Sequence, residues 1–335
     1  MYTGVDIFRL LAAIGIISIH TNVPWLSRLG RLGVPFFIII SMYFFFNHYL
    51  SLELKEEKQE YFKKFEIRLI TLFSCWQLLY LPFWYKSTKS FFIIHSVSIK
   101  SIGIYFFDFL FRISPTDING WFPSWYLMAM ILGVPVFLGL LKVFNSHLIF
   151  LGMICILIEG CYIAISEFGF ILHISDSLKS TFPRIFIYAY IGLITSKYFK
   201  KIKKFGLSKN LLLFITLLIL FLIENIIIYN LGGKYSSDET LLTAPTGMLL
   251  TWVSLLINPN VGKKLSLIVR RCSVFLYCVQ VWSIWIIGKF IMLDPKVSYK
   301  NISYFFLVGL LELGLYIFTY ILERKTKWKF ISNLM

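Results

Sequence analysis

The stretch GVDIFRLLAAIGIISIHTNVPW at residues 4–25 is one continuous apolar segment that carries a guanidinium, Arg9, and an imidazole, His20. An α-helix advances about 100° and 1.5 Å per residue, so these side chains share one helix face roughly 16 Å apart along the axis. Ionisable groups inside hydrocarbon usually face a protein interior or a wet cavity, and there they mark substrate paths or proton relays. The segment therefore predicts a first membrane span that forms one wall of an active site.

Composition also favours a membrane protein. The chain of 335 residues is 58% hydrophobic and only 15% charged, which is more apolar than a water-soluble domain of this size. We expect an all-α, polytopic integral membrane protein with a single transmembrane domain over residues 1–335. Ten apolar stretches are long enough to cross a bilayer, at residues 5–23, 33–50, 66–84, 122–142, 147–166, 184–198, 209–229, 241–257, 272–290 and 302–322.

One more apolar stretch, residues 91–111, is interrupted by His95, Lys100 and Asp108. Polar residues at this density do not suit a lipid-facing span. We expect an interfacial or re-entrant element there.

The distribution of lysine and arginine predicts the orientation in the membrane. With the N-terminus inside, the inner segments hold 16 of these residues in 56 positions, and the outer segments hold 10 in 85. Cytoplasmic loops carry the excess of positive charge, so both termini are expected in the cytoplasm, in a multi-pass protein of the inner (plasma) membrane. The net charge of +16 follows mostly from this asymmetry and from attraction to anionic lipid, and it does not indicate nucleic-acid binding.

Several common chemistries lack their sequence patterns here. The five cysteines lie in or beside predicted spans, and none forms a CxxC pair or a metal-ligand spacing with histidine, so we expect neither disulfides nor a metal. The chain has no phosphate-binding glycine loop, GxSxG elbow or HExxH motif. Any chemistry is therefore expected from polar residues within the membrane domain.

Five segments resemble motifs of one family. DIFRLLAAIGIISIH at 6–20 resembles the first-helix signature of the bacterial type-3 membrane acyltransferase family, and RLGVPFFIIISMYFFF at 31–46 is similar to its second-helix segment. WYLMAMILGVPV at 125–136, RIFIYAYIG at 184–192 and SVFLYCVQV at 273–281 resemble later family motifs in the expected order. The resemblance covers essentially the whole chain and is most specific at the first two segments.

The resemblance implies an O-acyltransferase that moves an acyl group, most often acetyl, from cytoplasmic acyl-CoA to a hydroxyl of an extracytoplasmic or lipid-linked glycan. Acetyl-CoA would be a donor substrate, with no permanently bound cofactor. His20 would be the catalytic base or a covalent acyl carrier near the outer end of the first span, since imidazole serves either role near neutral pH. Arg9 would lie nearer the cytoplasm, paired with Asp6 three residues earlier on the same helix.

Three positions depart from the family pattern. Met42 follows Ser41 where the family has glycine, Lys64 and Arg68 replace an arginine pair, and Gln280 replaces a histidine. These changes remove a close-packing residue, a planar guanidinium and a titratable group respectively. None of them changes Arg9 or His20.

Arginine and lysine residues near span ends are the supporting candidates. Arg31 suits an acceptor oxygen or the negative charge of a tetrahedral intermediate, although a snorkelling interfacial arginine would look the same. Lys63, Lys64 and Arg68 would meet CoA phosphates at the cytoplasmic mouth, although positive-inside anchoring explains them equally well.

Trp125, Tyr126 and Arg184 are the candidates for binding the acceptor, because aromatic faces pack against sugar rings. An aromatic belt and simple interfacial anchoring are the alternatives. Ser41 is a supporting candidate that also fits helix packing.

Three carboxylates lie inside predicted spans: Glu159, Glu224 and Glu312. We interpret them as protonated, hydrogen-bonded packing residues rather than partners of His20. His48, His95, His147 and His173 read as interfacial residues.

Two other functional classes stay open at this level. A transporter or flippase for polyisoprenoid-linked glycans would also have a basic inner face and polar residues around a cavity. An inactive scaffold of an envelope polysaccharide assembly complex would tolerate Met42 and Gln280.

Overall fold

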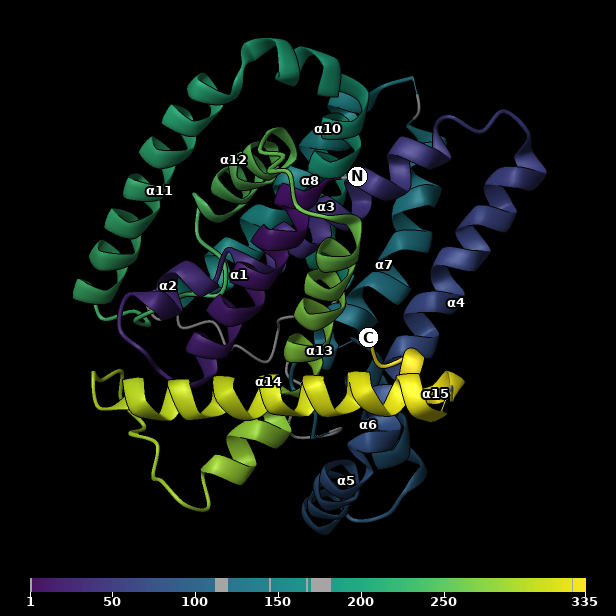
Figure 1. The fold of residues 1–335 in the computed structure, drawn as a ribbon. Helices are drawn as coiled ribbons and strands as arrows, with labels where there is room; N and C mark the ends of the chain where they lie inside the picture. The colour runs from purple at the N-terminus through teal and green to yellow at the C-terminus, as the bar shows by residue number, and fades with distance from the viewer. Residues whose placement is uncertain (1, 112–119, 145, 167, 170–181, 327) are drawn as a thin grey trace.

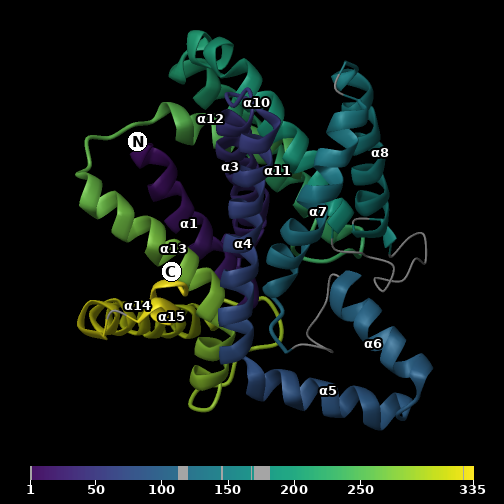
Figure 2. The same cartoon turned by 90° about the vertical axis from the view of Figure 1, so that its right-hand side faces the viewer.

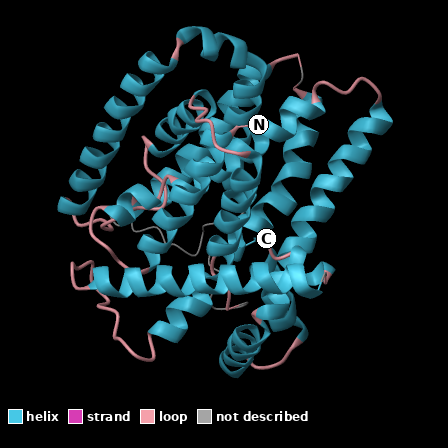
Figure 3. Cartoon of the chain, in the orientation of Figure 1, coloured by secondary structure: helices cyan, strands magenta, loops and turns pink. Residues whose placement is uncertain are grey.

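A computed structural model describes residues 2–111, 120–144, 146–166, 168–169, 182–326 and 328–335, and every regular element in this part of the chain is helical (Figure 3). The elements are α1 Thr3–His20, α2 Leu26–Gly30, α3 Gly33–Tyr49, α4 Lys55–Leu79, α5 Leu81–His95, α6 Ile99–Phe111, α7 Ser124–Val143, α8 Leu148–Ser166, η3 Phe182–Ile185, α10 Phe186–Phe205, α11 Leu207–Asn230, α12 Thr243–Leu256, α13 Lys263–Ile287, α14 Asn301–Thr326 and α15 Lys329–Ser332.

Each of the ten predicted spans contains one of these helices, but fewer than ten meet the requirements for crossing a membrane. Seven segments in the described part are long and apolar enough, and the bent pair α4 and α5 makes an eighth if it is one span. Helix α12 has only 14 residues, and α10 ends in the basic stretch KYFKKIKK. The chain is a polytopic membrane protein, with seven or eight candidate crossings rather than ten.

The third predicted span, residues 66–84, is wrong at its end. Helix α4 stops at Leu79, and α5 leaves it at 78°. Pro82 in the first turn of α5 has no backbone N–H, so the hydrogen-bond ladder of α4 cannot continue. Tyr80 fixes the corner, since its hydroxyl donates to the Cys278 carbonyl at 2.8 Å and its ring stacks on Trp121.

The predicted element at 91–111 is also two helices. Helix α5 ends at His95, Ser96 adopts a positive φ of 52°, and α6 begins at Ile99. In Figure 2 these helices form a corner at the lower end of α4. They extend sideways from α4 and pack mainly against it and against each other.

Successive long helices run in alternating directions. The α3–α4 loop and the α10–α11 turn lie toward the upper end in Figure 1, whereas the α11–α12 loop lies lower. The long apolar helix α14 differs, because it lies horizontally in Figure 1, whereas α4, α7 and α13 run roughly from top to bottom. Only 17% of its most apolar window is buried against protein, so most of its surface faces outward.

Glycine contacts bring α1 close to its neighbours. A Cβ on Gly30 would lie 2.1 Å from the carbonyl oxygen of Gly15, and one on Gly33 would lie 2.8 Å from Ile16. Helix α1 also packs along α13, which lies beside it in both views (Figures 1 and 2). Helix α1 is therefore held between α2 and α3 on one side and α13 on another.

Met42 stands where the family has a glycine, and a glycine on the facing helix, Gly192 of α10, packs against it. A Cβ on Gly192 of α10 would lie 2.6 Å from the Cβ of Met42 and 2.9 Å from the Ile39 carbonyl oxygen. Helices α3 and α10 thus approach closely through Gly192, and the side chain of Met42 is fully buried against it.

We expect Gly30→Ala to lower the free energy of unfolding by about 1–3 kcal/mol, because the added methyl group meets backbone rather than a flexible side chain. Gly139→Ala on α7 is the matched control, since no atom lies within 4 Å of its Cβ position. Equilibrium unfolding in detergent micelles measures both. Equal stability of the two variants would contradict the close approach of α1 and α2.

Candidate functional site: two cavities on one helix

Two cavities open at different levels of α1. We call the first the Arg9 cavity. It has a volume of about 740 Å³, and its polar lining includes Arg9, Ser41, Lys64, Arg68, Tyr126 and Arg270. We call the second the His20 cavity. It has a volume of about 330 Å³ and is lined by Ile16, Ile19, His20, Gly30, Arg31, Val34, Phe122, Pro123, Trp125, Arg184, Lys234, Asp238 and Tyr277.

Arg9 and His20 lie on one helix, but each side chain lines its own cavity. Tyr277 of α13 lines both cavities and lies between them. Side chains from the neighbouring helices fill the space between the two cavities.

Asp6 pairs with two of the arginines that line the Arg9 cavity. Its carboxylate is 1% exposed and lies 3.7 Å from the guanidinium of Arg9, as the spacing of three residues predicts. Its shorter contacts are with α13, where Arg270 donates from Nε at 2.8 Å and from a terminal nitrogen at 3.1 Å, and Ser266 donates its hydroxyl. One carboxylate therefore positions two guanidinium groups.

Arg270 is not among the residues singled out from the sequence. The pair Arg270 and Arg271 belongs to the positive charge of a predicted inner segment, and Arg270 lies three residues before the family-like motif at 273–281. Its position at the amphipathic end of a helix, next to that motif, was the sequence signal that Arg270 could be a site residue. Arg271 instead pairs with Glu323 of α14 at 2.6 Å.

The three predicted CoA-binding cations divide into two groups. Arg68 and Lys64 line the Arg9 cavity, whereas Lys63 is exposed and does not line it. Lys64 is itself paired with Glu60 at 2.7 Å on the helix surface. The geometry therefore favours Arg68 over Lys63 as a cation of this cavity.

Trp125 and Tyr126, which the sequence grouped together, face different cavities. Trp125 lines the His20 cavity, and Tyr126 lines the Arg9 cavity with Ser41. Adjacent residues on a helix project about 100° apart, and α7 passes between the cavities at this point. The structure therefore separates Tyr126 from Trp125 and Arg184, the two other acceptor candidates, which line the His20 cavity.

His20 is the last residue of α1, and the centroid of its ring lies 4.2 Å from that of the Phe122 ring. Arg31 and Asp238 share its cavity and form an ion pair. An imidazole, a guanidinium and a carboxylate thus open into one small space.

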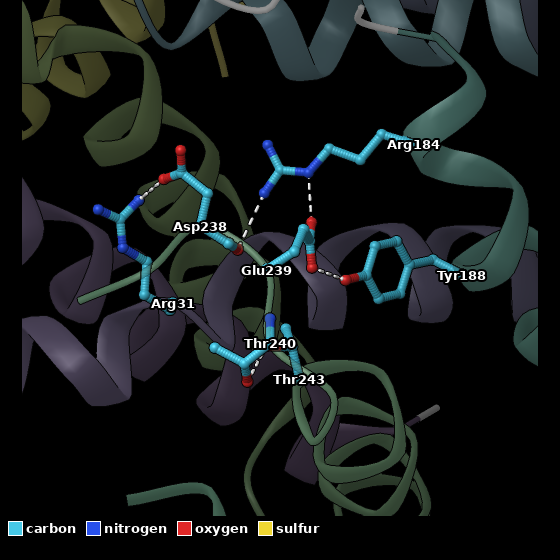
Figure 4. A network of polar contacts seen from close by, with 7 residues as sticks. All are labelled: Arg31, Arg184, Tyr188, Asp238, Glu239, Thr240 and Thr243. Atoms are coloured by element: carbon cyan, nitrogen blue, oxygen red, sulfur yellow. Dashed lines mark hydrogen bonds and ion pairs between the residues drawn. The ribbon is translucent and has the colours of Figure 1, made fainter. Parts of the chain in front are cut away.

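A polar network fixes the far wall of the His20 cavity (Figure 4). Arg184 donates to the Glu239 carboxylate and, at 3.1 Å, to the backbone carbonyl of Asp238. Tyr188 donates its hydroxyl to the same Glu239 carboxylate. The guanidinium of Arg184 also lies over the Trp125 ring, 4.3 Å from its centroid.

The acidic residues of this network belong to the α11–α12 loop, which the sequence-based reasoning treated only as a connection. Asp238 and Glu239 are adjacent acidic residues in a predicted outer loop, and buried arginines require such partners. That requirement was the signal for them. Glu224 of α11 holds the loop, because it accepts hydrogen bonds from Thr240 and from the backbone of Leu241 and Leu242.

The remaining polar candidates line neither cavity. Glu159 of α8 is buried next to the Arg184, Tyr188 and Glu239 network, and Glu312 is buried elsewhere in the helical packing. Gln280 is fully buried and donates to the Tyr277 carbonyl at 2.7 Å, so it supports α13 without reaching a cavity. His173 lies outside the described residues. Within them, no cluster of three metal-binding side chains occurs.

We expect Glu239→Gln to lower the free energy of unfolding by about 3–5 kcal/mol, because Arg184 would then be a buried charge without its partner. Replacing both, Arg184→Met with Glu239→Leu, should recover most of that loss. Glu60→Gln breaks an exposed pair and should leave stability unchanged. Equilibrium unfolding in micelles compares them, and a neutral Glu239→Gln would contradict the network.

The comparison with known proteins identifies a family. The model of the acyltransferase domain of the acyltransferase 3 family matches residues 2–323, nearly the whole chain. No curated protein and no solved structure matches the chain. The family expected from the motifs at 6–20 and 31–46 is therefore confirmed. With its apolar spanning helices, this chain belongs to the acyltransferase 3 family and is a membrane acyltransferase.

Proposed function

We propose that this protein transfers an acyl group, most often acetyl, from acyl-CoA in the Arg9 cavity to a glycan hydroxyl in the His20 cavity. The observation that carries the proposal is the placement of Arg9 and His20 in separate cavities on one helix. A donor and an acceptor from opposite sides of a membrane require two such entrances. Sequence charge supports a cytoplasmic entrance to the Arg9 cavity of an inner-membrane protein.

The Arg9 cavity has the charge that a CoA donor requires. Arg9, Lys64, Arg68 and Arg270 line it, and guanidinium groups bind phosphate with paired, charge-assisted hydrogen bonds. Asp6 neutralises only part of this positive charge. An apolar wall that includes Phe37, Phe45 and Leu72 would suit the less polar acyl end.

The His20 cavity suits a hydroxyl acceptor. One face of Trp125 is covered by Arg184, so a sugar ring would pack against the remaining exposed surface. Arg31, held by Asp238, supplies positive charge close to His20. That charge would stabilise the oxyanion of a tetrahedral intermediate.

The chemistry is a direct transfer or a two-step one. In the direct form, His20 takes the hydroxyl proton, the acceptor oxygen attacks the thioester carbonyl carbon, and the C–S bond breaks. The departing thiolate then takes the proton from His20 and leaves as free CoA. In the two-step form, a nitrogen of His20 attacks the thioester carbonyl carbon, the C–S bond breaks, and CoA leaves with the imidazole proton. The acceptor oxygen then attacks the acyl-imidazole, the C–N bond breaks, and the hydroxyl proton passes to His20.

The layout of the chain resembles that of the enterobacterial common antigen O-acetyltransferase, and this resemblance supports an envelope polysaccharide acceptor and an acetyl donor. Mass spectrometry of envelope glycans from cells with and without the gene tests this choice. An unchanged glycan with a displaced lipid-linked precursor would favour a flippase instead. Glycan assembly that fails when the whole chain is lost but is unaffected by His20→Ala would favour a scaffold.

We expect His20→Ala to lower kcat by about 10²–10⁴-fold, since the proton acceptor or acyl carrier is lost. His147→Ala is the control, because His147 is exposed at the start of α8 and lines neither cavity. Release of free CoA in the presence of acceptor measures both. Full activity of a folded His20→Ala protein would refute the assignment.

We expect Arg68→Gln to raise KM for acyl-CoA by about 10–100-fold with a smaller change in kcat, because a charge-assisted phosphate contact is lost. Lys63→Gln should leave KM unchanged, since Lys63 lies outside the cavity. Initial rates at varied acyl-CoA concentration measure the two constants. Equal effects of the two substitutions would place the CoA phosphates elsewhere.

A further inference from the structure

We propose that the Tyr277 side chain is a gate between the two cavities, and that it must move for the acyl group to reach His20. The mechanistic part of this inference rests on the proposed function. The structural part does not, because it concerns only what separates the Arg9 cavity from the His20 cavity.

Tyr277 is the residue that the linings of the two cavities share. It is buried, at 5% exposure, in the middle of α13. On the side of the Arg9 cavity its ring meets Tyr126 edge-on at 5.6 Å and Phe37 at 6.0 Å between centroids. The separation between the cavities at this point is therefore a layer of aromatic side chains.

One hydrogen bond holds the Tyr277 ring across this layer. Its hydroxyl donates to the carbonyl oxygen of Pro123 at 2.7 Å. Pro123 lines the His20 cavity and immediately precedes α7. The tyrosine thus links α13 to the start of α7, and a change of its rotamer requires the loss of this neutral hydrogen bond and of its ring contacts with Tyr126 and Phe37.

The proposed reaction requires this link to open. The thioester would enter with the CoA phosphates in the Arg9 cavity, whereas the imidazole lies in the His20 cavity. A closed ring would keep the thioester away from water on the acceptor side until an acceptor is bound, and many enzymes use such gating to suppress side reactions. The same closed ring would preserve the permeability barrier of the membrane.

Thiol accessibility in sealed vesicles tests the gate without any assay of catalysis. The reporter is Val34→Cys in a chain whose five natural cysteines are replaced, because Val34 lines the His20 cavity, as Tyr277 does. A membrane-impermeant thiol reagent is added to one side or the other. We expect labelling from the His20 side alone in the parent, and from both sides once Tyr277→Ala is added.

Tyr304→Ala is the matched control. Tyr304 is also a buried tyrosine whose hydroxyl donates to a backbone carbonyl, that of Ile284, but it lines neither cavity. Its removal should leave labelling one-sided. One-sided labelling of a monodisperse Tyr277→Ala protein would overturn the gate, and so would two-sided labelling of the parent.

Catalysis supplies a second readout. In Tyr277→Ala, release of CoA without acceptor should rise while acceptor acylation falls, because water from the acceptor side reaches the thioester. Tyr277→Phe keeps the ring and loses only the bond to Pro123, so it should show a smaller increase. A parent protein that consumes no acyl-CoA would contradict the proposed function, and the labelling result would still decide the gate. Unchanged acceptor-independent release in Tyr277→Ala would overturn the mechanistic role.

Discussion

Charged groups taken into an apolar bundle need opposite charges or water, and this requirement organises the structure around α1. Asp6 is buried between Arg9 and Arg270, so it joins α1 to α13 at one end. At the other end, Arg31 pairs with Asp238 of the α11–α12 loop. The partners come from distant parts of the chain, and the two cavities form where these charges face open space instead of lipid.

Close backbone packing determines how precisely those charges are placed. Gly15 and Gly30 allow α1 to approach the start of the second apolar segment, and Gly192 allows α10 to approach α3 at Met42. The loss of a family glycine at position 42 is thus matched by the small residue on the facing helix. Gln280 stands where the family has histidine. Its side chain donates to a carbonyl of α13 and lines neither cavity, so the change from a titratable to a neutral residue does not alter the charge lining either cavity.

The separation of the cavities changes how the reaction can be understood. A single chamber would let thioester, acceptor and water mix, whereas two cavities divided by aromatic rings keep them apart. Helix α7 contributes to both, with Trp125 on one side and Tyr126 on the other. The proposed transfer then depends on a conformational step as well as on the basicity of His20.

The sequence by itself determined the membrane setting, the helices within the ten apolar stretches and the position of Arg9 and His20 on one helix, because hydropathy and helical periodicity are local properties. The family followed from the resemblance of short motifs to those of known members. Other features depend on contacts between residues far apart in the chain. Arg270 meets Asp6 across 264 positions, and Glu239 meets Arg184 across 55, and no local pattern encodes such pairs. The bend after Leu79 depends on both, because Pro82 is a local signal whereas Tyr80 holds the corner through a contact with α13. The separation of the two cavities at Tyr277 was decided only when the helices packed, since side-chain volume from neighbouring helices fills any space they leave.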